Sequence, residues 1–412
     1  MISRSDMTLE EYIIDSIESV SPEVASMISD EDRRQSNQIE LIASENFMST
    51  AVRAALASSP VNKYAEGYPA KRETGRKGRY YGGCENIDRI ENYCCELWRK
   101  VYDTDYHVNV QPHSGTSANF AAYAAVCSRD STILAPKMSA GGHLSHSSEH
   151  SFVSDLYWVT GYGVDENGLL DYDEILDIAK WTQPKLIVAG MSAYSREIDY
   201  KAFAEIAQKV GAYLMVDMAH VAGIIATGYL QSPFPYADIV TTTTQKTLRG
   251  PRGGMIFCKP ELANKIDSAV FPFAQGGPHE NTIAAKAVCA AEALDPAYHD
   301  YIRNVTRNAK AMAMRFGDLG YHVVSGGTDN HMMLLDLRSK FPDMSGAEAE
   351  RILGEHGITV NKNLVPNDTR KPMQASGLRI GTPAMTTKGW GIAEFENCAD
   401  RIDELLKSCS SR

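Results

Sequence analysis

The chain has little positive charge, no long apolar run and no patterned cysteines, and each of these absences excludes a class of protein. Its 41 lysines and arginines against 52 acidic residues give a net charge of -11, which argues against nucleic acid or a membrane as the partner. No apolar stretch has the length of a membrane span, and the N-terminus lacks the features of a secretion signal. The eight cysteines have no metal-type Cys-x-x-Cys spacing, so we expect reduced thiols, no metal site and a cytoplasmic protein.

The overall composition is typical of an α/β enzyme, with 43% hydrophobic and 23% charged residues over 412 positions. Apolar stretches alternate with helical patterns between about residues 85 and 295, which predicts a mostly parallel, seven-stranded sheet with helices on both faces. We expect N-terminal helices and an arm in 1–60, a large domain in 61–295 and a small α+β C-terminal domain in 296–412. The expected strands of the large sheet are His107–Gln111, Thr132–Ala135, Leu156–Val159, Pro184–Ala189, Ala212–Val216, Ile239–Thr243 and Gly254–Cys258.

Two neighbouring strands end in side chains that suit one chemistry. Lys246 follows a buried, β-branched run, and Asp217 ends the apolar stretch before it. A lysine at the carboxyl end of such a strand can attack a carbonyl and form a Schiff base, and a carboxylate can keep a pyridine nitrogen protonated. This pair therefore predicts that the chain binds pyridoxal 5′-phosphate (PLP). A surface lysine that merely ends a strand is the rule for isolated lysines, but the flanking sequence disfavours it here.

Further motifs fit the same interpretation, although each has a structural alternative. Ser114-Gly115-Thr116 opens a small-residue helix and predicts an anion cradle, whereas a plain helix cap has the same composition. His143 lies in a glycine loop and can stack on a flat ring, and His220 can hydrogen-bond near it; both can equally be structural histidines. Arg379, on an apolar strand, offers a fork for a substrate carboxylate unless it forms a structural ion pair.

Longer motifs show that the chain resembles the serine (glycine) hydroxymethyltransferase family of fold-type I PLP enzymes, from about Ile39 to Gly389. These motifs are long and specific. They include Glu40–Asn46, Asn62–Pro69, Arg79–Glu85, Val110–Gly115, Gly141–Leu144, Val216–His220, Lys246–Arg252, Gln275–Pro278 and Val360–Asn363. The resemblance implies interconversion of L-serine plus tetrahydrofolate and glycine plus 5,10-methylenetetrahydrofolate. It also implies a homodimer with shared active sites, or a tetramer, in which residues 1–60 include a dimerisation arm.

The resemblance also implies roles for individual residues. Lys246 would form the Schiff base, Asp217 would hold the pyridinium nitrogen and His143 would stack on the PLP ring. The other residues implied for the PLP site are Ser114, Gly115, Thr116, Ser192, His220, Thr243 and Gln245, with Tyr64 and Gly277 from the other subunit. The residues implied for the amino acid are Ser44, Glu66, Tyr81 and Arg379, with Glu66 moving the proton of the hydroxymethyl group and Tyr81 and Arg252 shaping the site. Leu144 and Asn363 are implied for folate.

Some segments depart from the family pattern. Gln245 replaces the usual histidine before the lysine, and a glutamine cannot titrate. Residues 70–79 hold a basic insertion that either meets a folate polyglutamate tail or is a solvated loop. Residues 279–281 replace a commonly apolar segment, and Met138-Ser-Ala140 also differs.

These departures keep other hypotheses open. One is a diverged PLP aldolase or transaldolase that acts on β-hydroxy or α-methyl amino acids with little need for folate. Another is a non-catalytic PLP-binding or RNA-binding regulator, against which the acidic charge and the complete set of catalytic residues argue.

Overall fold

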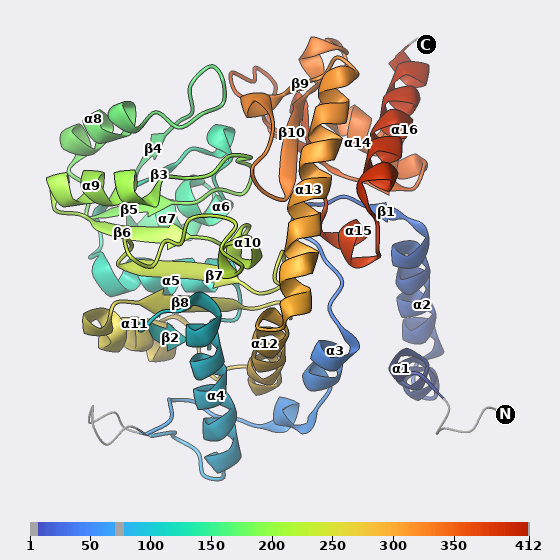
Figure 1. The fold of residues 1–412 in the computed structure, drawn as a ribbon. Helices are drawn as coiled ribbons and strands as arrows, with labels where there is room; N and C mark the ends of the chain where they lie inside the picture. Colours follow the sequence, from blue (N-terminus) through green and yellow to red (C-terminus); the bar gives the residue numbers. More distant parts are fainter. Residues whose placement is uncertain (1–6, 71–77, 411–412) are drawn as a thin grey trace.

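The computed structural model describes residues 7–70 and 78–410, which form a seven-stranded sheet, a four-stranded sheet, a two-stranded sheet and their covering helices (Figure 1). The large sheet has seven strands in the order β2-β8-β7-β6-β5-β3-β4, and only β8 runs against its neighbours. Its strands are β2 His107–Asn109, β3 Thr132–Pro136, β4 Trp158–Tyr162, β5 Leu186–Ala189, β6 Tyr213–Asp217, β7 Ile239–Thr243 and β8 Gly254–Cys258. The mostly parallel, seven-stranded sheet predicted from the sequence is confirmed.

One predicted strand was misplaced. Residues Leu156–Val159 were expected to be extended, but Leu156 ends the short helix Phe152–Leu156, in which the Tyr157 amide donates to the Val153 carbonyl. The strand therefore begins at Trp158. Apolar residues in a short run do not by themselves distinguish a buried helical turn from a buried strand.

The helices of the structure account for most of the remaining chain. They are α1 Leu9–Glu18, α2 Pro22–Asn37, α3 Thr50–Leu56, α4 Glu85–Tyr102, α5 Gly115–Val126, α6 Leu144–Ser147, α7 Phe152–Leu156, α8 Tyr172–Thr182, α9 Tyr200–Val210, α10 Ala222–Ala226, α11 Ala263–Ser268, α12 Glu280–Ala293, α13 Pro296–Asp318, α14 Gly346–Glu355, α15 Pro383–Thr387 and α16 Ile392–Ser410. Within residues 7–70 and 78–410, none of them has the length and apolar character needed to span a membrane.

Both faces of the large sheet are buried, which explains why its strands are continuously apolar. On β6, Leu214 and Val216 join one core with α4, α8 and α9, whereas Met215 joins the opposite core with α5 and α11. Because successive side chains on a strand point to opposite faces, each strand supplies both cores. The cores hold β6 and β7 rigidly, so the residues at their carboxyl ends have fixed positions.

The C-terminal part has its own sheet and core. Strands β12 Asn361–Asn363, β13 Gly377–Gly381, β10 Met332–Asp336 and β9 His322–Val323 form an antiparallel sheet in that order, packed against α13, α14 and α16. An N-terminal segment belongs to this unit, because β1 Ile39–Glu40 pairs with β11 Ile358–Thr359 and Leu41 lies in the same core. The chain after β1 continues along this small sheet, where the Gly381 amide donates to the Leu41 carbonyl.

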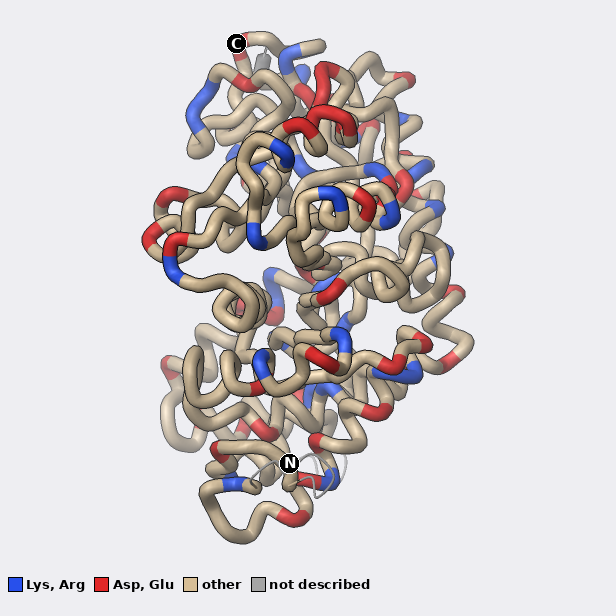
Figure 2. Tube along the Cα trace, turned by 90° about the vertical axis from the view of Figure 1, so that its left-hand side faces the viewer, with Lys and Arg blue, Asp and Glu red and all other residues tan. Residues whose placement is uncertain are grey.

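Lys and Arg residues are interspersed with Asp and Glu residues along the trace in Figure 2, and no extended region of one sign is visible in that view.

Candidate active site

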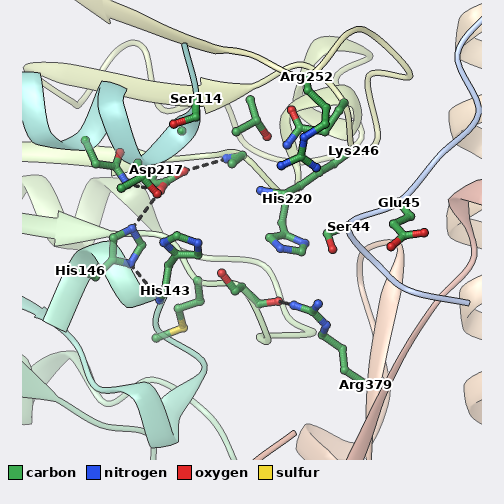
Figure 3. A pocket seen from close by; sticks show the side chains of 18 residues that line it. Ser44, Glu45, Ser114, His143, His146, Asp217, His220, Lys246, Arg252 and Arg379 are labelled. Atoms are coloured by element: carbon green, nitrogen blue, oxygen red, sulfur yellow. Dashed lines mark hydrogen bonds and ion pairs between the residues drawn. The ribbon is translucent and has the colours of Figure 1, made fainter. Parts of the chain in front are cut away.

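A cavity of about 330 Å³ lies where the carboxyl ends of β6 and β7 meet the small sheet (Figure 3). Its walls come from both units and from the N-terminal segment: Lys246 and Asp217 from the large sheet, Arg379 from β13 and Ser44 from the chain after β1. Its lining residues are Ser44, Glu45, Ser114, Gly115, Thr116, Asn119, His143, His146, Met191, Ser192, Asp217, Ala219, His220, Thr243, Gln245, Lys246, Arg252 and Arg379.

Lys246 lies three residues after the end of β7, and its side chain points into the cavity beside His220 and Arg252 (Figure 3). The Asn46 side-chain Nδ2 donates to the backbone carbonyl of Lys246 at 2.9 Å, which fixes the backbone at this point. Burial lowers the pKa of Lys246 to about 8; the Asp217 charge opposes this shift, and Arg379 and Arg252 add to it. Roughly a tenth of the amine is therefore neutral, and nucleophilic, at pH 7, far more than for an ordinary lysine.

Asp217, the last residue of β6, is held as a carboxylate. Its Oδ2 accepts from His146 Nε2 at 2.9 Å and from Asn119 Nδ2 at 2.8 Å, and its Oδ1 accepts from the Ala219 amide at 3.0 Å. Burial by itself raises the pKa of Asp217, but the hydrogen bond and charge of His146, the charge of Lys246 and the Asn119 bond together bring it below the ordinary value. The site therefore keeps a fixed negative charge opposite the lysine.

The start of α5 forms an anion cradle on the cavity wall. Ser114 caps the helix and accepts from the Ser117 amide at 3.2 Å, so the cap predicted as an alternative is present as well. Glycine is required at position 115, because a Cβ there would lie 2.7 Å from Thr243 Cγ2. Thr243 is 5% exposed, and its Oγ1 has no hydrogen-bond partner among residues 7–70 and 78–410. A free hydroxyl beside a helix N-terminus is suited to an anion such as a phosphate.

Two neutral histidines line the middle of the cavity. Burial lowers the pKa of His143 to about 4, with an opposing effect of Asp217 and further lowering by His146 and Lys246. Burial also lowers the pKa of His220 well below its ordinary value, helped by Lys246 and Arg379. His220 Nδ1 lies 3.3 Å from Nε2 of His331, which the small sheet supplies. Both cavity rings are therefore uncharged at neutral pH.

Arg379 points from β13 into the cavity and lacks a carboxylate partner among the described residues. Its Nη1 donates to the Ser192 carbonyl at 2.7 Å and its Nε donates to Asn361 Oδ1 at 3.1 Å. Burial lowers its pKa to about 10, so the guanidinium stays charged at neutral pH. The structural ion pair considered as an alternative is absent from the described part of the chain. A partly buried cation without a counterion is suited to an anionic ligand.

Four predicted site residues gather elsewhere. Tyr64 and Tyr81 have ring centroids 4.9 Å apart, the Tyr64 hydroxyl lies 3.5 Å from Glu66 Oε1, and a Cβ on Gly277 would meet the Tyr64 ring at 3.4 Å. None of the four lines the Lys246 cavity of the same chain. Two of them, Tyr64 and Tyr81, are exposed to solvent, at 56% and 44%.

The two residues that the resemblance implies for folate also lie outside the cavity lining. Leu144 is 58% exposed and directly follows His143, and Asn363 ends β12. Of the departures from the family pattern, Gln245 lines the cavity and its Oε1 accepts from the Gly253 amide at 3.5 Å. Residues 71–77 of the basic insertion lie outside the described residues.

Sequence reasoning missed three residues that shape the site. Asn119 and His146 bind the Asp217 carboxylate, and His331 meets His220. Asn119 lies one helical turn after Gly115, so the two share a face of α5, and that spacing was the signal available. His331 directly precedes β10 of the small sheet, and no local pattern in the sequence indicates that it lies beside His220.

A sequence model of the family described as serine hydroxymethyltransferase matches residues 17–402, nearly the whole chain. The match covers the large sheet, the cavity and the small sheet, in agreement with the geometry described above. The members of this family are PLP-dependent transferases. The chain therefore belongs to the serine hydroxymethyltransferase family.

Proposed function

We propose that this enzyme transfers the hydroxymethyl group of L-serine to tetrahydrofolate, giving glycine and 5,10-methylenetetrahydrofolate, with PLP held at Lys246. The observation that carries the proposal is that Lys246, the ionised Asp217 and the unpaired Arg379 face one cavity. A neutral amine suits the cofactor aldehyde, a carboxylate suits a ring nitrogen, and a guanidinium suits an amino-acid carboxylate.

The described residues fit PLP at each end of the molecule. The free Thr243 hydroxyl, Ser114 and the first amides of α5 match a phosphate, and the absence of a side chain at Gly115 lets Thr243 lie against the helix start. His143 offers a flat neutral ring, and His220 and Ser192 offer polar groups between the two ends. When bound, PLP supplies an electron sink that stabilises negative charge at the α-carbon of the amino acid.

The chain's own residues prepare this chemistry electrostatically. Asp217 retains its charge because His146 and Asn119 hold it, so it can keep a ring nitrogen protonated. Lys246 is available as the neutral amine because burial lowers its pKa to about 8. His143 and His220 stay neutral, so neither places a positive charge beside the ring nitrogen that Asp217 would hold. These groups are in place before substrate arrives, which is the condition for electrostatic preorganisation.

Arg379 orients the amino acid. Its bonds to Ser192 and Asn361 use Nη1 and Nε, which leaves Nη2 for a substrate carboxylate. Ser44 also lines the cavity and can donate to the same group. A substrate fixed in this way has a defined direction for the bond that breaks, and such orientation is a large part of enzymatic rate enhancement.

We further propose that the enzyme is a homodimer in which the group of Tyr64, Glu66, Tyr81 and Gly277 completes the cavity of the other subunit. This group lies together on the surface and does not line the cavity of its own chain, which is the arrangement that a shared site requires. In that place Glu66 would take up and return the proton of the substrate hydroxyl. Pairing of such dimers into a tetramer is compatible with the same site.

Folate would bind at the cavity mouth beside Leu144 and Asn363. The exposed Leu144 follows His143 and offers apolar surface for a flat ring system, and Asn363 offers an amide that can pair with ring nitrogens.

The second candidate is an aldolase or transaldolase for β-hydroxy or α-methyl amino acids with little dependence on folate. Gln245 favours it, since this residue lines the cavity next to Lys246 and cannot titrate as a histidine would. Both candidates use the same cofactor and carboxylate clamp, so they differ only in the group that is transferred and its acceptor.

The test compares kcat/KM for L-serine, L-threonine and α-methylserine, with and without tetrahydrofolate. Preference for serine with strong dependence on tetrahydrofolate supports the hydroxymethyltransferase. Equal cleavage with and without folate, and preference for another of the three substrates, supports the aldolase and contradicts our proposal.

A further inference from the structure

A buried carboxyl group with no hydrogen bond lies close to the segment that carries Glu66. Glu280, the first residue of α12, is 1% exposed. Neither of its carboxyl oxygens has a hydrogen-bond partner among residues 7–70 and 78–410. Buried polar groups without a hydrogen-bond partner are rare and cost free energy. One that persists suggests that the group has a function in another state of the protein.

The nearest cation is Arg79, and it is already fully engaged. Its Nε donates to Asp88 Oδ1 at 2.8 Å and its Nη2 donates to Glu91 Oε2 at 2.7 Å, both on α4. Its Nη1 donates at 2.8 Å to the carbonyl of Ala65 and at 2.9 Å to that of Gly67. Both hydrogens of Nη1 are thus used, and Glu280 Oε1 stands 3.6 Å from this nitrogen, at ion-pair distance but without a hydrogen bond.

These bonds fix the backbone on both sides of Glu66. Arg79 holds the carbonyls of Ala65 and Gly67, and the Tyr80 amide donates to the carbonyl of Glu66 itself at 2.9 Å. On the other side, a Cβ on Gly276 would lie 3.2 Å from Glu66 Oε1, so the loop before Glu280 touches the Glu66 side chain. A change in Arg79 is therefore transmitted directly to Glu66.

The charges around Glu280 disfavour its ionisation. Burial is the main cause, and Glu91 and Asp88 on α4 add to it, while Arg79 and Lys286 oppose it; together they raise the pKa of Glu280 to about 8. Lys286 gives its hydrogens to the carbonyls of Val110, Pro112 and Gly254 and has none left for Glu280. At neutral pH the Glu280 carboxyl is therefore mostly protonated, and a modest rise in pH ionises it.

We propose that Glu280 is a positioning residue for Glu66 that acts through Arg79. While the Glu280 carboxyl is neutral, the guanidinium holds the two carbonyls that flank Glu66. When the carboxyl ionises, it draws Nη1 away from these carbonyls and loosens the segment 64–68. The inference rests on the proposed function only in giving Glu66 a proton-handling role.

The experiment compares the wild type with Glu280→Gln, which keeps the shape but cannot ionise, and with Glu280→Met. Glu85→Gln is the matched control, because Glu85 is also the first residue of a helix but is exposed to solvent. We expect the two enzymes to have a similar kcat for serine at pH 7. At about pH 9 the kcat of the wild type should be about tenfold lower than that of Glu280→Gln, because Glu66 is then no longer aligned with the substrate. KM for serine should change little, since the carboxylate clamp is untouched. Lys246 titrates in the same range in every variant, so the comparison cancels its effect.

Two readouts do not depend on activity. Infrared spectroscopy at neutral pH should show a protonated carboxyl band that is lost in Glu280→Gln and kept in Glu85→Gln. Amide hydrogen exchange in residues 64–68 should be faster in the wild type than in Glu280→Gln at about pH 9, and equal at pH 6.

Coincident pH profiles of kcat, or the absence of the infrared difference, would overturn the inference. If the wild type transfers no hydroxymethyl group, the proposed function fails, and the infrared and exchange measurements still decide the role of Glu280.

Discussion

Replacing Thr243 by valine should make the cofactor-free enzyme more stable and make it bind PLP more weakly. The Thr243 side chain is 5% exposed, and its hydroxyl has no partner in the described part of the chain. A buried polar group without a partner costs about 1–3 kcal/mol, so an apolar side chain of the same shape should raise the free energy of unfolding by about 1 kcal/mol. If the hydroxyl is there to bind a phosphate, its loss should lower PLP affinity roughly tenfold to hundredfold, as for a hydrogen bond to a charged group of about 1.5–3 kcal/mol.

The assay is urea unfolding of the enzyme stripped of PLP and of the enzyme loaded with it, together with PLP titration followed by visible absorbance. Thr241→Val is the matched control, because Thr241 lies on the same strand, is 1% exposed and donates to Asn119 Oδ1 at 2.7 Å. That variant loses a hydrogen bond already made in the cofactor-free protein, so it should destabilise both forms by about 1 kcal/mol.

The two variants are expected to change the free energy of unfolding of the cofactor-free protein in opposite directions. Destabilisation of the cofactor-free protein by Thr243→Val, with unchanged PLP affinity, would show that the hydroxyl has a structural role. The assignment of the phosphate to the start of α5 would then be refuted.

Four further predictions concern the cavity and the proposed dimer. Burial lowers the pKa of Lys246 to about 8 and only its neutral amine attacks an aldehyde, so the rate of PLP loading should rise with pH below about 8 and level off above it. Asp217→Asn should move this midpoint to lower pH, because the carboxylate raises the pKa of the lysine; an unchanged midpoint would contradict the electrostatics. Arg379→Lys should raise KM for the amino acid roughly tenfold to hundredfold through loss of the planar fork, and a change in kcat alone would place the carboxylate elsewhere. Homodimers of Lys246→Ala and of Glu66→Gln should each be inactive. When their subunits are mixed, half of the dimers contain one of each, and one of the two sites in such a dimer is intact, so about a quarter of the wild-type activity should return. No recovery would mean that both residues belong to the site of the same chain.

The sequence predicted the large sheet well because its strands are buried on both faces. The apolar runs before Asp217 and Lys246 favour internal strands of a layered α/β fold, and parallel strands bring their ends to one edge. Ser114–Thr116 and Arg379 were predicted for related reasons, since small residues at a helix start and an arginine on an apolar strand are conspicuous in the sequence. The structure places all of these residues on one cavity.

Other features depend on contacts between distant segments. Arg79 and Glu280 lie about two hundred positions apart in the sequence, and their neighbourhood arises only when α12 packs against α4. His331, just before β10, reaches His220, and Ile39–Glu40 pair with Ile358–Thr359 from more than three hundred positions away. No local periodicity carries this information, because it resides in the packing of complete elements.

The most direct test of the proposed function follows the third carbon of L-serine. Serine labelled with carbon-13 at that position is incubated with the PLP-loaded enzyme, with and without tetrahydrofolate, and the products are followed by NMR. Our account predicts that the label appears in the methylene group of 5,10-methylenetetrahydrofolate, together with unlabelled glycine, and that release without folate is slow by comparison. Release of labelled formaldehyde at the same rate with and without tetrahydrofolate would contradict it.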